Sequence, residues 1–214
     1  MSLKKATIII VVVLLIDQLS KIYIKTNFPL TAFGHNAIVD WGFFKLLFVE
    51  NKGMAWGTKL SDFIPFISDR TAKTILTTFR LLAIIGIGYW LHGAIKKNSP
   101  KILIICIALI FAGALGNIID SVFYGVLFGD SYGQVAAFLP EGGGYETLFH
   151  GHVVDMLQFP LATWTWPDWI PGIGGRQYTF FEPVFNIADS SISVGVMLLL
   201  LFNKKAFPPK PSEA

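Results

Sequence analysis

The chain has 214 residues, of which 53% are hydrophobic and only 14% are charged, and its mean hydropathy is +0.59. Soluble domains usually carry about 25% charged residues, so this composition indicates an integral membrane protein. The net charge of +3 is too small to indicate a nucleic-acid-binding protein. The single cysteine, Cys106, excludes an internal disulfide and any metal site built from several cysteines.

The first predicted membrane span covers residues 6–24. Its start resembles a signal peptide, but no small-residue cleavage site follows, and the apolar run continues past Asp17 to Ile24. Asp17 and Lys21 are four residues apart and therefore share one helix face. We expect this pair to support the neighbouring backbone, because an acid that a cation neutralises makes a poor proton donor.

Residues 29–65 contain no predicted span. Residues 38–49 are rich in aromatic and β-branched side chains, and Asn51-Lys52-Gly53 is a turn signal. This pattern predicts a small sheet at the membrane surface that either anchors the chain or holds a lipid-bearing substrate. Its aromatic residues suit the membrane interface; they are Trp41, Phe43, Phe44, Phe48 and Trp56.

Three further spans are predicted over residues 71–95, 102–119 and 183–202, which gives a single polytopic domain over residues 1–214. Arg80 lies within the second span and must face the protein interior or reach the interface. Small residues near the end of the third span permit close helix packing; they are Ala112, Gly113, Ala114 and Gly116. Residues 121–181 form a long outer section, and the sequence does not reveal what its segments 125–151 and 161–181 do.

The lysines predict the orientation of the chain. Both ends and the short loop between the second and third spans fall on one side of a four-span arrangement, and they carry Lys4, Lys5, Lys96, Lys97, Lys101, Lys204, Lys205 and Lys210. Basic residues that flank spans favour the cytoplasm. We therefore expect both termini to be cytoplasmic.

With this orientation, three acids converge near the outer face: Asp120, Asp155 and Asp189. Two adjacent carboxylates share a proton, so one can activate water while the other polarises a scissile carbonyl, which is the chemistry of aspartic proteases. The residues alone leave open whether Asp155 or Asp120 is the partner of Asp189. His150 and His152 with Asp155 are only weak evidence for a metal site, and we expect no metal or cofactor.

Five motifs, in this order along the chain, resemble the lipoprotein signal peptidase (signal peptidase II) family. They are Asp17-Gln18-x-Ser20-Lys21, Asn51-x-Gly53-x-Ala55-Trp56, Gly116-Asn117-x-x-Asp120, Val153-Val154-Asp155 and Phe185-Asn186-x-Ala188-Asp189. The resemblance implies an aspartic endopeptidase of the bacterial inner membrane, with four transmembrane helices, a small β-cradle and an active site at the outer face. Such an enzyme removes signal peptides from diacylglyceryl-modified prolipoproteins, on the N-terminal side of the lipidated cysteine.

The resemblance also assigns roles to individual residues. It implies Asp155 and Asp189 as the catalytic pair, and contacts with the substrate from four residues, namely Asn51, Gly53, Asn117 and Asn186. Asp17, Lys21 and Asp120 would support the site. Membrane lipids and lipid-modified prolipoproteins are the implied partners.

Two departures from the family pattern matter. Ser121 stands where the family usually has Arg, so the salt bridge of the preceding acid is in doubt, and Arg80 or Arg176 could replace that partner. The outer segments 125–151 and 161–181 are longer than usual and could form a lid or decorate the outer face. The alternatives are a small proton-coupled transporter, for which intramembrane acids are typical, and a scaffold, which would leave the convergent acids unexplained.

Overall fold

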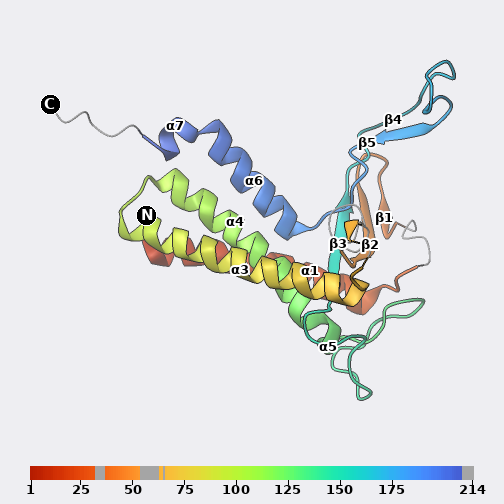
Figure 1. Ribbon diagram of the computed structural model, residues 1–214, viewed down its shortest axis with the longest axis horizontal. Helices are drawn as coiled ribbons and strands as arrows, with labels where there is room; N and C mark the ends of the chain where they lie inside the picture. Colours follow the sequence, from red (N-terminus) through yellow and green to blue (C-terminus); the bar gives the residue numbers. More distant parts are fainter. Residues whose placement is uncertain (32–36, 54–62, 65, 209–214) are drawn as a thin grey trace.

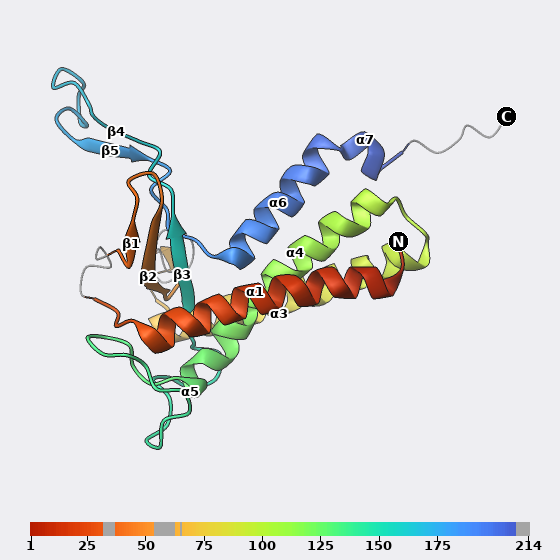
Figure 2. The ribbon, with the colours of Figure 1, turned by 180° about the vertical axis from the view of Figure 1, so that it is seen from behind.

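A bundle of helices extends along the molecule, and a small sheet stands across one end of it (Figure 1). This computed structural model describes residues 1–31, 37–53, 63–64 and 66–208. The longer helices are α1 (Leu3–Asn27), α3 (Asp69–Lys96), α4 (Lys101–Ile119) and α6 (Ile187–Leu201), and the short α7 (Asn203–Ala206) follows α6. The N-terminus and α7 lie at the end of the bundle away from the sheet (Figure 2).

Within the described part of the chain, three helical stretches are long and apolar enough to cross a membrane: Leu3–Asn27, Asp69–Lys96 and Lys101–Leu127. Large apolar side chains on their outer faces are exposed, for example Leu19 at 63% and Ile85 at 67%, as expected for surfaces that face lipid. The apolar helix α6 has 15 residues, which is shorter than these three. The prediction of a fourth span therefore remains a prediction.

The third helical stretch is longer than the sequence predicted. After Ile119 the chain continues through a π-helical turn, Asp120–Tyr124, and then through α5 (Gly125–Leu127). The predicted end at residue 119 treated Asp120 as a boundary. Asp120 is instead fully buried and paired with Lys21, so its charge does not end the helix, and Ser121 is helical rather than part of an outer loop.

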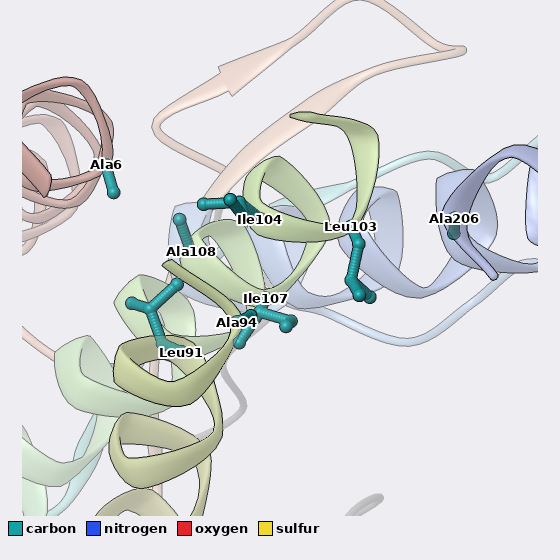
Figure 3. Packing of buried hydrophobic residues seen from close by; sticks show 8 residues of the cluster. All are labelled: Ala6, Leu91, Ala94, Leu103, Ile104, Ile107, Ala108 and Ala206. Carbon is teal, nitrogen blue, oxygen red and sulfur yellow. The ribbon is translucent and has the colours of Figure 1, made fainter. Parts of the chain in front are cut away.

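Helix α4 is the centre of the bundle, with α1, α3 and α6 packed around it. At the end of the bundle near the termini, small and branched apolar side chains of four helices interlock (Figure 3). Towards the sheet, α4 and α6 approach closely at Gly113, where an added Cβ would lie 2.2 Å from the carbonyl oxygen of Ala188. This contact confirms the close packing predicted from the small residues of α4.

The sheet combines two distant parts of the sequence. Its antiparallel strands β1 (Val39–Asp40), β2 (Lys45–Asn51) and β3 (Val153–Gln158) lie in the order β1-β2-β3. A small sheet was predicted in this region, but the pairing of β2 with β3 was not. The register places Asp155 opposite Val49 and Val153 opposite Asn51.

The predicted aromatic belt is only partly correct. Trp41 and Phe43 are exposed, at 67% and 64%. Phe48, in contrast, is 4% exposed and packs in the core beneath the sheet with Ile24 and Val154. Trp56 and its neighbour Ala55 lie outside the described residues.

A second hairpin, β4 (Ala162–Thr165) and β5 (Gln177–Phe180), projects from the sheet end of the molecule (Figures 1 and 2). Its aromatic side chains pack mainly on each other, with the rings of Trp164 and Tyr178 4.8 Å apart.

The segment between α5 and β3, in contrast, folds back against the end of α1. Leu30 pairs with Tyr132, and the amide of Ala136 donates to the carbonyl of Lys25.

Candidate active site

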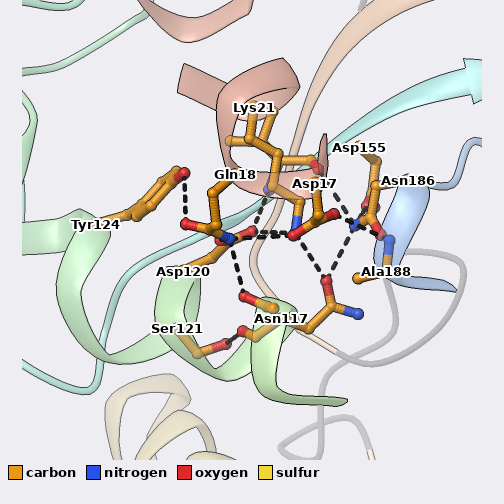
Figure 4. Close-up of polar contacts among 12 residues, drawn as sticks. Asp17, Gln18, Lys21, Asn117, Asp120, Ser121, Tyr124, Asp155, Asn186 and Ala188 are labelled. Carbon is orange, nitrogen blue, oxygen red and sulfur yellow. Dashed lines mark hydrogen bonds and ion pairs between the residues drawn. The ribbon is translucent and has the colours of Figure 1, made fainter. Parts of the chain in front are cut away.

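An ion cluster joins α1 to α4 at the level of the sheet. Lys21 Nζ lies 2.9 Å from Asp17 Oδ2 and 2.8 Å from Asp120 Oδ2, and all three side chains are fully buried (Figure 4). The predicted pair of Asp17 and Lys21 is therefore present. Because buried charges are costly unless they are paired and hydrogen-bonded, this cluster fixes the two helices relative to each other.

Asp120 also connects the helices to the sheet. Its Oδ1 accepts a hydrogen bond from Gln18 Nε2 at 2.9 Å, and its Oδ2 accepts one from the amide of Val154 at 3.3 Å. Val154 directly precedes Asp155, so Asp120 holds the backbone of the residue next to that acid. The carboxylate of Asp120 is thus occupied by Lys21, Gln18 and Val154.

The start of α6 is stabilised from two directions. Asn186 caps the helix: its Oδ1 accepts from the amide of Asp189 at 2.9 Å, and Asp189 Oδ2 accepts from the amide of Asn186 at 3.2 Å. This reciprocal arrangement is a capping box. Asp17 Oδ1 accepts from the amide of Ala188 at 2.9 Å, so a carboxylate also satisfies another free amide of the first turn.

Two amide side chains connect the acids to each other. Asn117 Nδ2 donates to Asp189 Oδ1 at 2.7 Å, and Asn186 Nδ2 lies 2.7 Å from Asp155 Oδ1 and 3.0 Å from Asn117 Oδ1. Lys21 Nζ also donates to Asn117 Oδ1, at 3.1 Å. Asn117 and Asp120 are three residues apart, as are Asn186 and Asp189, and this spacing favours a contact of each amide with the acid of its own motif. Asn186 does contact Asp189, but Asn117 crosses to Asp189 and Asn186 also crosses to Asp155.

Asp155 is buried, with 4% of its surface exposed, and it lies on β3. Burial and the negative charge of Asp189 raise the pKa of Asp155 from 3.8 to about 7, although hydrogen bonds from Asn51 and Asn186 partly oppose that rise. The donor on Asn51 is its Nδ2, 3.2 Å from Asp155 Oδ2. A carboxyl of this kind can hold a proton near neutral pH.

Gly53 and Arg80 lie at the edge of this group. The amide of Gly53 donates to Asn51 Oδ1 at 3.0 Å, and its carbonyl accepts from Arg80 Nη2 at 3.4 Å. Arg80 Nη1 reaches Ser121 Oγ at 3.4 Å. Arg80 therefore lies beside the residue that replaces the usual Arg, whereas the partner of Asp120 is Lys21. Arg176 lies at the far hairpin, where its carbonyl accepts from the amide of Trp166.

The histidines considered for a metal site have other contacts. His152 Nδ1 lies 2.9 Å from Glu50 Oε2, and His150 contacts Thr74 and Thr147. No group of three or more potential metal-binding side chains occurs among the described residues. A cavity of about 520 Å³ borders Gly53, Lys73 and His152, and neither Asp155 nor Asp189 is among its described lining residues.

Sequence reasoning gave no role to several residues that complete the site. Gln18 connects Asp17, Asp120 and the carbonyl of Gly116, and Tyr124 OH donates to Gln18 Oε1 at 3.2 Å. Lys25, which is fully buried, was also given no role. Its spacing of four residues from Lys21, which repeats the spacing of Lys21 from Asp17, was the sequence signal that could have identified it.

The fold and the site together define a multi-pass membrane protein in which helices and a surface sheet bring together buried acids and the amides that bind them. The chain belongs to the signal peptidase II family, whose profile, described as Signal peptidase (SPase) II, matches residues 9–204. It is therefore a bacterial membrane peptidase.

Individual relatives agree with this assignment. The chain is 44% identical over 199 residues to a protein of Porphyromonas gingivalis named lipoprotein signal peptidase, covering 92% of this chain and 82% of that relative. A protein of the same name from Amoebophilus asiaticus is 35% identical over 199 residues, or 92% of this chain and 75% of the relative. A solved structure described as a bacterial membrane enzyme is also similar, with a TM-score of 0.58 and 25% identity over 99% of this chain and 95% of that one.

Proposed function

We propose that this peptidase is an aspartic endopeptidase that removes signal peptides from diacylglyceryl-modified prolipoproteins, with Asp155 and Asp189 as its catalytic pair. The single observation that carries the assignment is that Asn186 hydrogen-bonds to both acids, while the pKa of Asp155 is raised to about 7. The names of the relatives supply the class of substrate. Nothing in these similarities supports the alternative, a transporter.

The proposed reaction uses the two acids in different protonation states. Asp189, as a carboxylate, removes a proton from a water molecule, and the water oxygen attacks the scissile carbonyl carbon. Asp155 donates its proton to the carbonyl oxygen. As the C–N bond breaks, the proton held by Asp189 passes to the leaving nitrogen. One hydroxyl of the tetrahedral intermediate returns its proton to Asp155 as the C=O bond re-forms, which restores both acids.

The amides orient this pair. Asn117 and Asn186 are bound to the carboxylates and to each other in the free protein, so we assign them first to holding the acids. Contacts of Asn51, Gly53, Asn117 and Asn186 with substrate remain a prediction. Asp120 is occupied by Lys21, Gln18 and Val154, which favours a supporting role for it over a place in the catalytic pair.

We further propose four spans with the site at the outer face. Helix α6 covers Ile187–Leu201, about 22 Å of helix at 1.5 Å per residue, and the residues that flank it would complete a crossing of the ~30 Å hydrocarbon core. The lysines near both ends favour a cytoplasmic position for those ends. The sheet then lies at the outer surface, where a lipid-modified substrate can enter laterally with its acyl chains still in the bilayer.

Cleavage of a purified lipidated precursor by the reconstituted protein tests the assignment. Asp155→Asn and Asp189→Asn should each abolish turnover, while Asp40→Asn, on the exposed β1, should leave it unchanged. Near-complete activity in either catalytic variant would refute the pair. If Asp120→Asn folds and binds substrate normally but has lost the chemical step while Asp155→Asn has not, the pair is Asp120 with Asp189.

A further inference from the structure

A second buried ion cluster lies beside the acid pair and uses residues that belong to none of the five motifs. Lys25 Nζ pairs with Glu50 Oε1 and donates to Ser131 Oγ at 2.7 Å, and Ser131 Oγ donates to Glu50 Oε1 at 2.8 Å. His152 Nδ1 lies 2.9 Å from the other oxygen, Glu50 Oε2. Helix α1, strand β2 and the segment between α5 and β3 therefore meet at one carboxylate.

The ion pair at the centre of this cluster is buried. The side chain of Lys25 is fully buried and that of Glu50 is 6% exposed. The ammonium lies over the ring of Tyr145, 4.7 Å from its centroid, and Tyr145 OH accepts from the amide of His152 at 2.7 Å. Burial alone would raise the pKa of Glu50, but His152 and Lys25 reverse that effect and lower it to about 2. Glu50 is therefore an anion near neutral pH.

The position of the cluster connects it to Asp155. Glu50 directly precedes Asn51, whose Nδ2 donates to Asp155 Oδ2 at 3.2 Å. On the neighbouring strand, Glu50 pairs with Val154, and His152 lies three residues before Asp155. The cluster therefore fixes both strands on either side of the Asn51–Asp155 contact.

Stability alone does not explain a buried ion pair, because well-packed apolar side chains of similar volume are often equally stable. Unlike apolar contacts, the ion pairs and hydrogen bonds of Glu50 require a defined geometry. They therefore restrain the backbone next to Asn51. Ser131 and Tyr145 both lie in the segment between α5 and β3, so that segment completes the cluster.

We propose that Lys25, Glu50 and His152 are positioning residues that hold Asn51 against Asp155, and that the long segment 125–151 serves to complete this cluster. The inference rests on the proposed catalytic role of Asp155. It gives the segment a function in the geometry of the site, distinct from that of a lid over the cleft.

A double-mutant cycle with Asn51 tests the proposal. Combining Lys25→Met with Glu50→Gln removes one charge of each sign. Turnover of the lipidated precursor by the full chain should fall about ten- to a hundred-fold, as for other losses of catalytic geometry, with KM changed less than about two-fold. In an Asn51→Ala background, the same two substitutions should lower turnover almost no further, because the hydrogen bond from Asn51 to Asp155 that the cluster supports is already absent.

The pH profile supplies a second readout. The charged groups that act on Asp155 are Asp189 of α6, Lys21 of α1 and Arg80 of α3, and the double variant changes none of them. Since the hydrogen bond from Asn51 lowers the pKa of Asp155, loss of that bond should move the alkaline limb of kcat to higher pH. An unmoved limb would contradict the proposal.

The matched control is the exposed pair of Asp40 and Lys45 on β1 and β2, 3.0 Å apart. Asp40→Asn with Lys45→Met makes the same neutral change on the same sheet and should leave turnover unchanged. If the Lys25/Glu50 variant fails to fold, Ser131→Ala removes only one member and should show a smaller loss in the same cycle. Equal losses with and without Asn51 would overturn the proposal, whereas full activity of Asp155→Asn would instead refute the catalytic pair.

Discussion

At the scale of single residues, Asp155 connects the geometry of the site to pH. Burial and Asp189 raise its pKa to about 7. The proposed reaction requires Asp155 to be protonated, because it donates that proton to the scissile carbonyl oxygen. Turnover should therefore be high below pH 7 and should fall as the pH rises through about 7. Initial rates of precursor cleavage between pH 5 and 9 check this. A rate that keeps rising to pH 9 would mean that Asp155 does not act as the acid.

The same shift predicts a change in stability. A carboxyl whose pKa rises from 3.8 to about 7 on folding holds its proton more tightly in the folded state, so stability decreases as the pH rises from about 4 to 7 and stays low above it. The cost above pH 7 is up to about 4 kcal/mol. Asp155→Asn should remove much of this pH dependence, measured as the difference in unfolding temperature between pH 5 and pH 8. An unchanged difference in the variant would contradict it.

Lys21 should be the least replaceable residue of the site. It contacts Asp17, Asp120 and Asn117, so Lys21→Met would leave two buried acids without their cation. Breaking a buried ion pair costs about 3–5 kcal/mol, and we expect a large drop in unfolding temperature together with loss of activity. Lys45→Met removes a lysine from a partly exposed pair and is the control. Equal effects of the two substitutions would count against the central role of Lys21.

At the scale of elements, the contact between α4 and α6 sets the position of Asp189. Gly113→Ala would place a Cβ 2.2 Å from the carbonyl oxygen of Ala188, so α6 must move away and carry Asp189 with it. Both stability and turnover should fall. Gly86→Ala, on α3, meets nothing within 4 Å and should stabilise the helix by up to about 1 kcal/mol. Thermal unfolding and cleavage assays on both variants would show whether the effect is specific to this contact.

The elements also show how far sequence patterns reach. Long apolar runs predicted α1, α3 and α4, and small residues predicted the close approach of α4, because both signals are local. The pairing of β2 with β3 joins residues about a hundred positions apart, and nothing local specifies it. For the same reason the outward position predicted for Phe48 was wrong, since the face that a strand buries depends on its partners.

Within the candidate site, the sequence predicted that the acids converge but not how their hydrogen bonds are distributed. The spacing of Asn186 and Asp189 predicted their contact, whereas the bond from Asn117 to Asp189 crosses between helices. The choice of Asp155 over Asp120 depended on the family motifs. The contacts of Asp120 with Lys21 and Val154 now supply a physical argument for that choice.

At the scale of the whole molecule, the N-terminus and helix α7 lie at the end of the bundle opposite the sheet (Figure 1). In the proposed topology both lie on the cytoplasmic side, which requires an even number of crossings, so the proposal has α6 span the membrane although it is the shortest of the four long helices. Single cysteines can test this after Cys106, which is buried, is replaced by Ala. Ser2, Asp168 and Lys204 are exposed positions near the N-terminus, at the far hairpin and after α6.

With a membrane-impermeant maleimide on spheroplasts, Asp168→Cys should react at once, and Ser2→Cys and Lys204→Cys only after lysis. The three positions discriminate between topologies, because each crossing moves the next segment of the chain to the opposite side of the membrane. If Lys204→Cys reacts without lysis while Ser2→Cys does not, α6 fails to cross and the protein has three spans. If Ser2→Cys and Lys204→Cys both react without lysis and Asp168→Cys does not, the orientation is inverted, and the acids would face the cytoplasm, where a substrate entering from the outer leaflet could not reach them.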